Sequence, residues 1–312
     1  MIGLKTLNSL KKYWKVTNNK LMSIKKLLIA INEGLTEFQH LFVFFLGLLV
    51  DFPKKPFKYK KAREGSLVVL ANGPSLKDVL KKINTSEEFD NVEFSVMNFF
   101  ACSPYFKEIR PKFYCLVDPM FCMSTWHDEE VNKVFKNLEE DVDWDMTLFI
   151  PAYYRLSRFK QFSRLTNAHI KIVVLNSSCY LGKSSKVFCW LFKRGLTIPR
   201  STVAQTCIYT AINMGFNNIR LYGMEHTFFG SLMVNKECKL CSIEEHFYGQ
   251  DEKLKPLLRN DNGKQYKVSD FLLQKGHLFF MHDMLSDYAK SVGCRIINCT
   301  PITMIDSYER VY

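Results

Sequence analysis

From Ser66 onward, short apolar segments of β character alternate with stretches whose apolar residues recur at helical spacing. Strands that are buried on both faces read as continuous apolar runs, so this alternation predicts a parallel sheet covered by helices on both sides. We therefore expect an α/β fold with a doubly wound, mostly parallel sheet. The predicted strands lie near residues 66–71, 92–97, 113–117, 146–150, 170–175, 218–223 and 294–298, and the predicted helices near 75–83, 128–139, 155–165, 183–193, 202–214 and 279–291.

The first expected strand runs into a turn and then a helix. The apolar run 66–71 breaks at Asn-Gly-Pro-Ser, where Gly73 allows a turn that other residues cannot adopt. Ser75 with Asp78 three residues later is typical of a capping box, which places the start of the helix there. Such a loop presents free N–H groups at the positive end of a helix dipole, and phosphate is their natural ligand. An ordinary strand–turn–helix without a ligand explains this segment equally well.

Parallel sheets bind ligands beyond the carboxyl ends of their strands. In this sequence the rule selects residues 72–75, Asn98, Asp118-Pro119, Pro151, residues 176–178, residues 223–227 and residues 298–301.

The stretch from about 225 to 278 has no strong period and contains His226, His246 and His277. A long, weakly patterned insertion near the strand ends is typical of a lid or an acceptor-binding element. Its aromatic residues indicate that it packs at least in part, although disorder is the plain alternative.

Positive charge is concentrated at the N-terminus. Residues 1–63 hold thirteen Lys or Arg and three acidic residues, so ten of the twelve net positive charges lie there. The apolar run 41–50 is too short to span a bilayer, for which about 20 residues are needed. With the basic cluster 54–63, it suits the surface of an anionic membrane. A helical hairpin packed on the body or used for self-association is the alternative, and no nucleic-acid partner is expected.

We thus expect a basic, apolar helical arm over 1–63, with a linker over 53–63, and one catalytic domain over 64–312. The sequence has ten cysteines, mostly within apolar patterns. Because no signal peptide is evident, a reducing cytoplasm is expected and disulfides are not. Cys238 and Cys241 have zinc spacing, but without a second such pair we expect no zinc site.

The ordered motifs resemble a known family. Leu67-Val-Val-Leu-Ala-Asn-Gly-Pro-Ser-Leu76 is similar to the opening motif of the bacterial sialyltransferases of glycosyltransferase family 42, which related archaeal pterin pyrophosphokinase-like proteins share. The block Arg200 to Gly215, followed by Ile219-Arg-Leu-Tyr-Gly-Met-Glu225, resembles the family's Arg-x-Thr-Ser-Gly helix and its Gly-x-Asp strand. The resemblance covers residues 66–305 in patches and leaves the N-terminal arm outside.

The resemblance implies inverting transfer of sialic acid from CMP-sialic acid to a glycan, on a Rossmann-like domain with a lid and with no cofactor required. Asp118 stands where the family often has Asn, which leaves room for a divalent metal. The implied donor-binding residues are Asn72, Gly73, Pro74, Ser75, Asn98, Asp118, Arg200, Ser201, Thr202, Gly223, Glu225 and Thr300.

The resemblance also implies a histidine base. His246-Phe-Tyr-Gly249 is similar to the family's His-Tyr-x-Gly segment, so His246 is the first candidate and His277 the second. The family's two phosphate-binding tyrosines are absent, because Thr227, Phe228 and Phe229 occupy their stretch. Tyr248 would supply a hydroxyl instead.

The expected function is a bacterial glycosyltransferase that uses a CMP-activated sugar to extend a surface glycan of the lipooligosaccharide or capsule type. It would work in the cytoplasm at the inner face of the cytoplasmic membrane, on a glycan or glycolipid acceptor. Homo-oligomerisation is compatible with this function. One alternative is a Mg²⁺-dependent pyrophosphokinase-like enzyme with Asp118 and Glu225 as metal ligands. Another is a catalytically inactive scaffold in glycan assembly.

Overall fold

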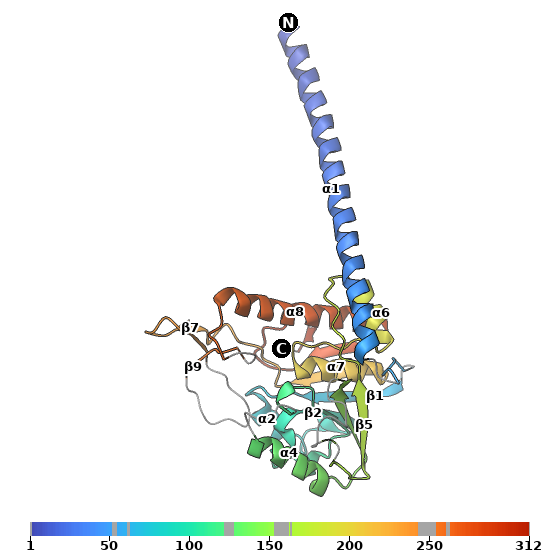
Figure 1. The fold of residues 1–312 in the computed structure, drawn as a ribbon, viewed down its shortest axis with the longest axis vertical. Helices are drawn as coiled ribbons and strands as arrows, with labels where there is room; N and C mark the ends of the chain where they lie inside the picture. Colours follow the sequence, from blue (N-terminus) through green and yellow to red (C-terminus); the bar gives the residue numbers. More distant parts are fainter. Residues whose placement is uncertain are drawn as a thin grey trace. The chain divides into compact units, whose positions relative to one another are not determined.

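The structure is a computed structural model of residues 1–312, shown in Figure 1. It describes all residues except 1, 52–54, 61–62, 122–127, 153–161, 163, 243–253, 260–262 and 312. The chain forms two compact units. The first combines residues 1–50 with residues 180–184, and the second contains residues 51–179 and 185–312.

The first unit is built on the helix α1 (Ile2–Asp51). In the C-terminal third of this helix, the Glu37 carboxylate accepts hydrogen bonds from the backbone amide of Ser184, at 3.1 Å, and from the Tyr180 hydroxyl. About two helical turns further on, the Phe44 ring meets the Tyr180 ring edge-on, with the centroids 6.0 Å apart. These contacts attach the short segment 180–184 to one face of α1. Within the described part of the chain, no helix is both long enough and apolar enough to cross a membrane.

The second unit contains an eight-stranded sheet in which every neighbouring pair is parallel. The strand order is β11-β10-β6-β1-β2-β3-β4-β5. This sheet confirms the predicted fold class. Its strands are β1 (Arg63–Leu70), β2 (Val92–Met97), β3 (Phe113–Cys115), β4 (Met146–Pro151), β5 (Ile170–Leu175), β6 (Phe216–Tyr222), β10 (Arg295–Asn298) and β11 (Glu309–Arg310).

Helices cover both faces of this sheet (Figure 1). The apolar side chains of α2 (Leu76–Leu80), α3 (Phe106–Ile109) and α4 (Asp128–Asp141) form one core with strand residues such as Val68 and Leu70. The other face carries α6 (Ser185–Lys193), the fully buried α7 (Val203–Asn213) and α8 (Val268–Ser291). The described part of the unit also contains the short 3₁₀ turns η1 (Glu87–Phe89), η2 (Asn98–Cys102) and η3 (Pro119–Phe121). The predicted helix over 155–165 falls mostly outside the described residues.

The expected lid is partly regular structure. Between β6 and α8, the strands β7 (Met233–Val234), β8 (Leu240–Ser242) and β9 (Lys255–Pro256) form a small antiparallel sheet. The helix predicted over 279–291 begins earlier than expected, because α8 starts at Val268. Leu272 and Leu273 are exposed on its first turns. Apolar residues on the outer face weaken the helical spacing of apolar residues in the sequence, so the start of this helix is hard to predict.

Residues 55–60 of the expected linker over 53–63 belong to the second unit and pack within it. The amide of Tyr59 donates to the Lys193 carbonyl at 2.9 Å. The buried Asn213 side chain donates to the carbonyls of Phe57, at 2.8 Å, and Phe192, at 3.0 Å, and accepts from the Tyr288 hydroxyl at 2.7 Å. Aromatic side chains between the lysines give this segment an apolar face, which charge counting overlooks.

Candidate functional site

The sheet reverses its direction of winding between two adjacent strands. After β1 the chain enters α2 on one face of the sheet, whereas after β6 it leads to α8 on the other face. The crevice at such a switch point is where open α/β sheets bind ligands. Most of the predicted site residues follow five neighbouring strands along this edge: Thr300 after β10, Gly223 and Glu225 after β6, residues 72–75 after β1, Asn98 after β2 and Asp118 after β3.

The centre of this edge is a contact between the loops after β1 and β6. Glu225 is buried, and its Oε1 accepts a hydrogen bond from the backbone amide of Ser75 at 2.8 Å. The amide of Gly73 donates to the carbonyl of Gly223, also at 2.8 Å. A Cβ atom on residue 73 would overlap the Glu225 carboxylate and would lie 2.6 Å from the Gly223 oxygen. Glycine is therefore required at position 73 because an internal carboxylate lies against its Cα.

This geometry corrects the expectation of free amides at the start of α2. The Ser75 amide is held by Glu225, and the amides of Leu76, Lys77 and Asp78 donate to carbonyls three residues earlier in the chain. Ser75 has helical backbone angles and makes no capping hydrogen bond, so the predicted capping box is wrong. Gly73 is also not among the residues with positive φ. The loop is closed by a protein carboxylate and does not present a ring of unused donors.

Several side-chain oxygens at this edge are buried and have no hydrogen-bond partner among the described residues. They are Asn72 Oδ1, Ser75 Oγ, Asn98 Oδ1 and Glu225 Oε2. Three of the four can only accept a hydrogen bond, and the serine hydroxyl can donate or accept. Buried polar atoms are almost always paired in folded proteins, so this concentration needs an explanation. A ligand that brings several hydroxyl or amino groups would pair them.

Thr300 and Gly223 hold the loop after β6 in place. The Thr300 hydroxyl accepts a hydrogen bond from the Met224 amide at 3.0 Å, and the Met304 amide donates to the Glu225 carbonyl at 2.9 Å. Gly223 has φ +67°, a left-handed conformation that favours glycine. Both residues thus fix the backbone of the loop that carries Glu225.

Asp118 follows β3 and lies three strands from Glu225. Its Oδ1 accepts from the Met120 amide at 3.0 Å, and burial raises the pKa of the carboxyl above its usual range. Three strand spacings correspond to roughly 14 Å between the two backbone positions. One metal ion with ligand distances near 2–2.6 Å would not be shared across that separation.

A second group of predicted residues lies at the start of α7. The Cys207 thiol reaches the Val96 carbonyl near the end of β2, so the preceding turn of α7 extends beyond the carboxyl edge of the sheet. Thr202 caps this helix by accepting from the Gln205 amide at 3.3 Å. Ser201 Oγ lies 3.0 Å from His277 Nδ1, and Arg200 is exposed beside them. The structure therefore brings the predicted base His277 to the positive end of an eleven-residue helix.

Partial burial lowers the pKa of His277, which keeps the imidazole neutral near pH 7. When Nδ1–H donates to Ser201, Nε2 carries a lone pair and acts as a base. The other two predicted catalytic residues, His246 and Tyr248, lie outside the described residues.

The expected site residues do not include one histidine of the selected range 223–227. His226 directly follows Glu225, has φ +50°, and its ring lies 5.2 Å from the rings of both Phe228 and His282. Burial lowers the pKa of His226 to about 3, with a smaller contribution from the charge of Lys275. His282 Nδ1 hydrogen-bonds to the Tyr308 hydroxyl at 2.9 Å. No local spacing connects residues 226, 282 and 308, so only the tertiary fold reveals this cluster.

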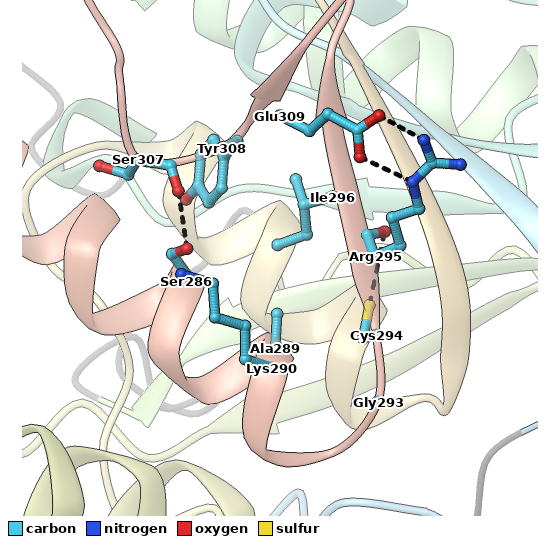
Figure 2. Close-up of a pocket in the computed structure, with 10 residues that line it drawn as sticks. All are labelled: Ser286, Ala289, Lys290, Gly293, Cys294, Arg295, Ile296, Ser307, Tyr308 and Glu309. Atoms are coloured by element: carbon cyan, nitrogen blue, oxygen red, sulfur yellow. Dashed lines mark hydrogen bonds and ion pairs between the residues drawn. The ribbon is translucent and has the colours of Figure 1, made fainter.

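In the described ranges, no three His, Cys, Asp or Glu side chains gather to hold a metal ion. Cys238 is exposed and Cys241 is buried in the small sheet. A cavity of about 470 Å³ lies at the opposite end of β10, where Arg295 pairs with Glu309 (Figure 2). Burial raises the pKa of Cys294, which lines this cavity, to about 12, so its thiol stays protonated.

No protein-family model matches the sequence, and a comparison with curated proteins finds no match. Among solved structures, the chain is similar to the MAf glycosyltransferase from Magnetospirillum magneticum AMB-1, with 13% sequence identity and a TM-score of 0.46. The match covers 82% of this chain and 35% of that chain, so this chain spans about a third of the length of that protein.

Proposed function

We propose that the protein is a glycosyltransferase that binds a nucleotide-activated sugar at the carboxyl edge of the sheet, between β1 and β6. The observation that carries the proposal is the set of buried, unpartnered oxygens on Asn72, Ser75, Asn98 and Glu225. Ribose and hexose rings carry several hydroxyl donors, which match a row of acceptors better than a bare phosphate does. The residues follow three adjacent strands, and two strand spacings, roughly 10 Å, span a ribose and its neighbouring group.

The phosphate of the donor would then bind at the start of α7. The dipole of this helix is positive there, and the exposed Arg200 adds a full charge. Ser201 and His277 lie at the same helix end, 3.0 Å apart. A neutral imidazole would then lie next to the phosphate and would take the proton of the acceptor hydroxyl as the glycosidic bond forms.

The donor that the family resemblance favours is CMP-activated sialic acid or a similar keto-acid sugar. The acceptor would be a bacterial surface glycan, and transfer would invert the anomeric centre. The separation between Asp118 and Glu225 weighs against the pyrophosphokinase alternative, which requires both carboxylates on one magnesium site. The unpartnered oxygens weigh against a scaffold that binds no nucleotide.

The test is calorimetric titration of CMP and CMP-sialic acid into the wild type, the Glu225→Gln variant and a matched control, Glu129→Gln, on the exposed surface of α4. A hydrogen bond to a charged group contributes about 1.5–3 kcal/mol, so Glu225→Gln should weaken CMP-sialic acid binding by roughly 10- to 150-fold. The control should bind like the wild type. If neither nucleotide binds the wild type, or if all three proteins bind alike, the proposal is wrong.

Catalysis is tested by the release of CMP from CMP-sialic acid with a galactose-terminated acceptor. His277→Asn should lower kcat by about 10²–10⁴ while donor affinity is retained. An unchanged kcat would remove His277 as the base and leave the donor site in place.

A further inference from the structure

One stripe of α1 exposes large apolar side chains at every position. Between residues 28 and 49, the side chains at alternating intervals of three and four residues are 43–83% exposed. They are Leu28, Ile31, Leu35, Phe38, Phe42, Phe45 and Leu49. Glu37 and Phe44, which hold the segment 180–184, lie on a different face of the helix. The stripe is therefore separate from the contact that builds the first unit.

The same spacing continues toward the N-terminus in the sequence. With Leu28 as heptad position a, Leu7, Trp14 and Leu21 fall at a, and Leu10 and Ile24 fall at d. Thr17 is the single polar residue between positions 7 and 49 of this series. The apolar repeat thus covers six heptads of one continuous helix that contains no proline (Figure 1). Sustained a and d positions of this kind are the signature of a coiled coil.

The seven-residue period of the stripe distinguishes between a membrane surface and a second helix as its binding partner. In a straight helix of 3.6 residues per turn, a seven-residue repeat drifts by about 20° per heptad. Over the six heptads from Leu7 to Leu49, the stripe turns by about 120° around the helix axis. A flat membrane surface would meet only part of such a stripe. A second helix that winds around the first would follow it along its whole length.

We propose that α1 joins copies of this chain to one another through a coiled coil whose seam is formed by these a and d residues. The area is adequate for a stable interface. A phenylalanine side chain has about 200 Å² of surface, so the exposed fractions of Phe38, Phe42 and Phe45 leave roughly 340 Å² uncovered on each helix. The four aliphatic residues of the seam expose a comparable area. The total approaches the roughly 800 Å² per partner of a standard interface.

The residue types in the seam also indicate the number of strands. Leucine occupies position a at residues 21, 28 and 35, and isoleucine occupies position d at residues 24 and 31. In parallel coiled coils, leucine at a with isoleucine at d favours three or four strands over two. The assembly is therefore a trimer or a tetramer.

The experiment measures the molar mass of the full chain by light scattering coupled to size-exclusion chromatography. Two double variants are compared with the wild type. Leu35→Glu with Phe38→Glu places two charges in the seam, and Ile29→Glu with Val43→Glu places the same charges at b positions outside it. All four positions are exposed, and circular dichroism checks that both variants remain folded.

We expect three or four chains per particle for the wild type and for the b-position variant, and a single chain for the seam variant. A monomeric wild type, or equal loss of assembly in both variants, would overturn the proposal. Co-sedimentation with vesicles of phosphatidylcholine and phosphatidylglycerol forms the second arm. If the wild type is monomeric and both variants lose vesicle binding equally, a membrane covers this helix and the coiled coil is excluded. None of these outcomes depends on nucleotide binding.

Discussion

Replacing Gly73 by alanine tests the contact at the centre of the site. The new Cβ would overlap the Glu225 carboxylate and stand 2.6 Å from the Gly223 carbonyl, closer than real Cβ atoms approach. The carbonyl is fixed because it accepts the hydrogen bond from the amide of residue 73. The carboxylate must therefore move, and its bond to the Ser75 amide is lost.

Three contributions determine how much Gly73→Ala changes the free energy of unfolding. Loss of a hydrogen bond to a buried charge costs about 1.5–3 kcal/mol, and forcing a methyl group into a packed site costs about 1–3 kcal/mol. Alanine also lowers the conformational entropy of the unfolded chain, which stabilises the folded state by about 0.4–1 kcal/mol. The free energy of unfolding should fall by about 3 kcal/mol. In a domain of this size, that lowers Tm by roughly 6–12 °C.

Thermal melting followed by circular dichroism measures the effect. Gly276→Ala is the matched control, because it lies in α8 with no atom near the added Cβ and should raise stability by about 0.5–1 kcal/mol. The double variant Gly73→Ala with Glu225→Ala should lose less than the sum of the two single variants. A Gly73→Ala protein that melts within about 1 °C of the wild type would refute the contact.

Two further predictions concern stability. His226 and His282 have pKa values far below the ordinary 6.5, mainly because of burial, so the unfolded chain binds more protons than the folded chain below that pH. The free energy of unfolding is therefore at its full value above about pH 6.5 and falls by roughly 1.4 kcal/mol per pH unit for each histidine as the pH drops. Between pH 7 and pH 5, urea unfolding of His282→Gln should show a smaller loss of stability than the wild type. An unchanged loss would contradict the low pKa of His282. Asn213→Leu should lower the urea midpoint by an amount equivalent to about 3–5 kcal/mol, because three hydrogen bonds of this buried side chain lose their partner. A midpoint near that of the wild type would show that these bonds contribute little.

The sequence predicts the sheet well because the information is local. Continuous apolar runs such as 66–71 and 146–150 specify strands that are buried on both faces, and helices between them force parallel pairing. The rule for carboxyl ends then selects Asn72, Asn98 and Glu225 without any knowledge of their contacts. The structure shows that these three residues do follow adjacent strands.

Contacts between distant parts of the chain could not be predicted. Ser75 and Glu225 are 150 residues apart. Since either a phosphate or a protein carboxylate can accept from the Ser75 amide, the Asn-Gly-Pro-Ser motif alone does not show which of the two it binds. The pairing of Ser201 with His277 is equally invisible, because a lone histidine in an apolar helix is usually structural. The heptad repeat of α1 is readable in the sequence. Its meaning becomes clear only once the structure shows that the stripe is exposed.

The carboxylate of Glu225 restricts which part of a ligand can approach the loop after β1. Two unit charges 4 Å apart near a protein surface interact by about 4 kcal/mol, a factor of about 10³ in affinity. A phosphate bound at residues 72–75 would meet this repulsion, whereas a sugar hydroxyl would donate to Oε2 and gain a charge-assisted bond.

The neutral variant Glu225→Gln therefore separates the two arrangements by the sign of its effect. If the loop holds hydroxyl groups, as we propose, the variant binds CMP-sialic acid more weakly than the wild type. If the loop holds the phosphate, removal of the negative charge tightens binding, and the phosphate site at the start of α7 is excluded. Arg200→Gln gives the complementary result: it should weaken CMP binding when the phosphate lies at α7 and leave it unchanged when the phosphate lies at the loop.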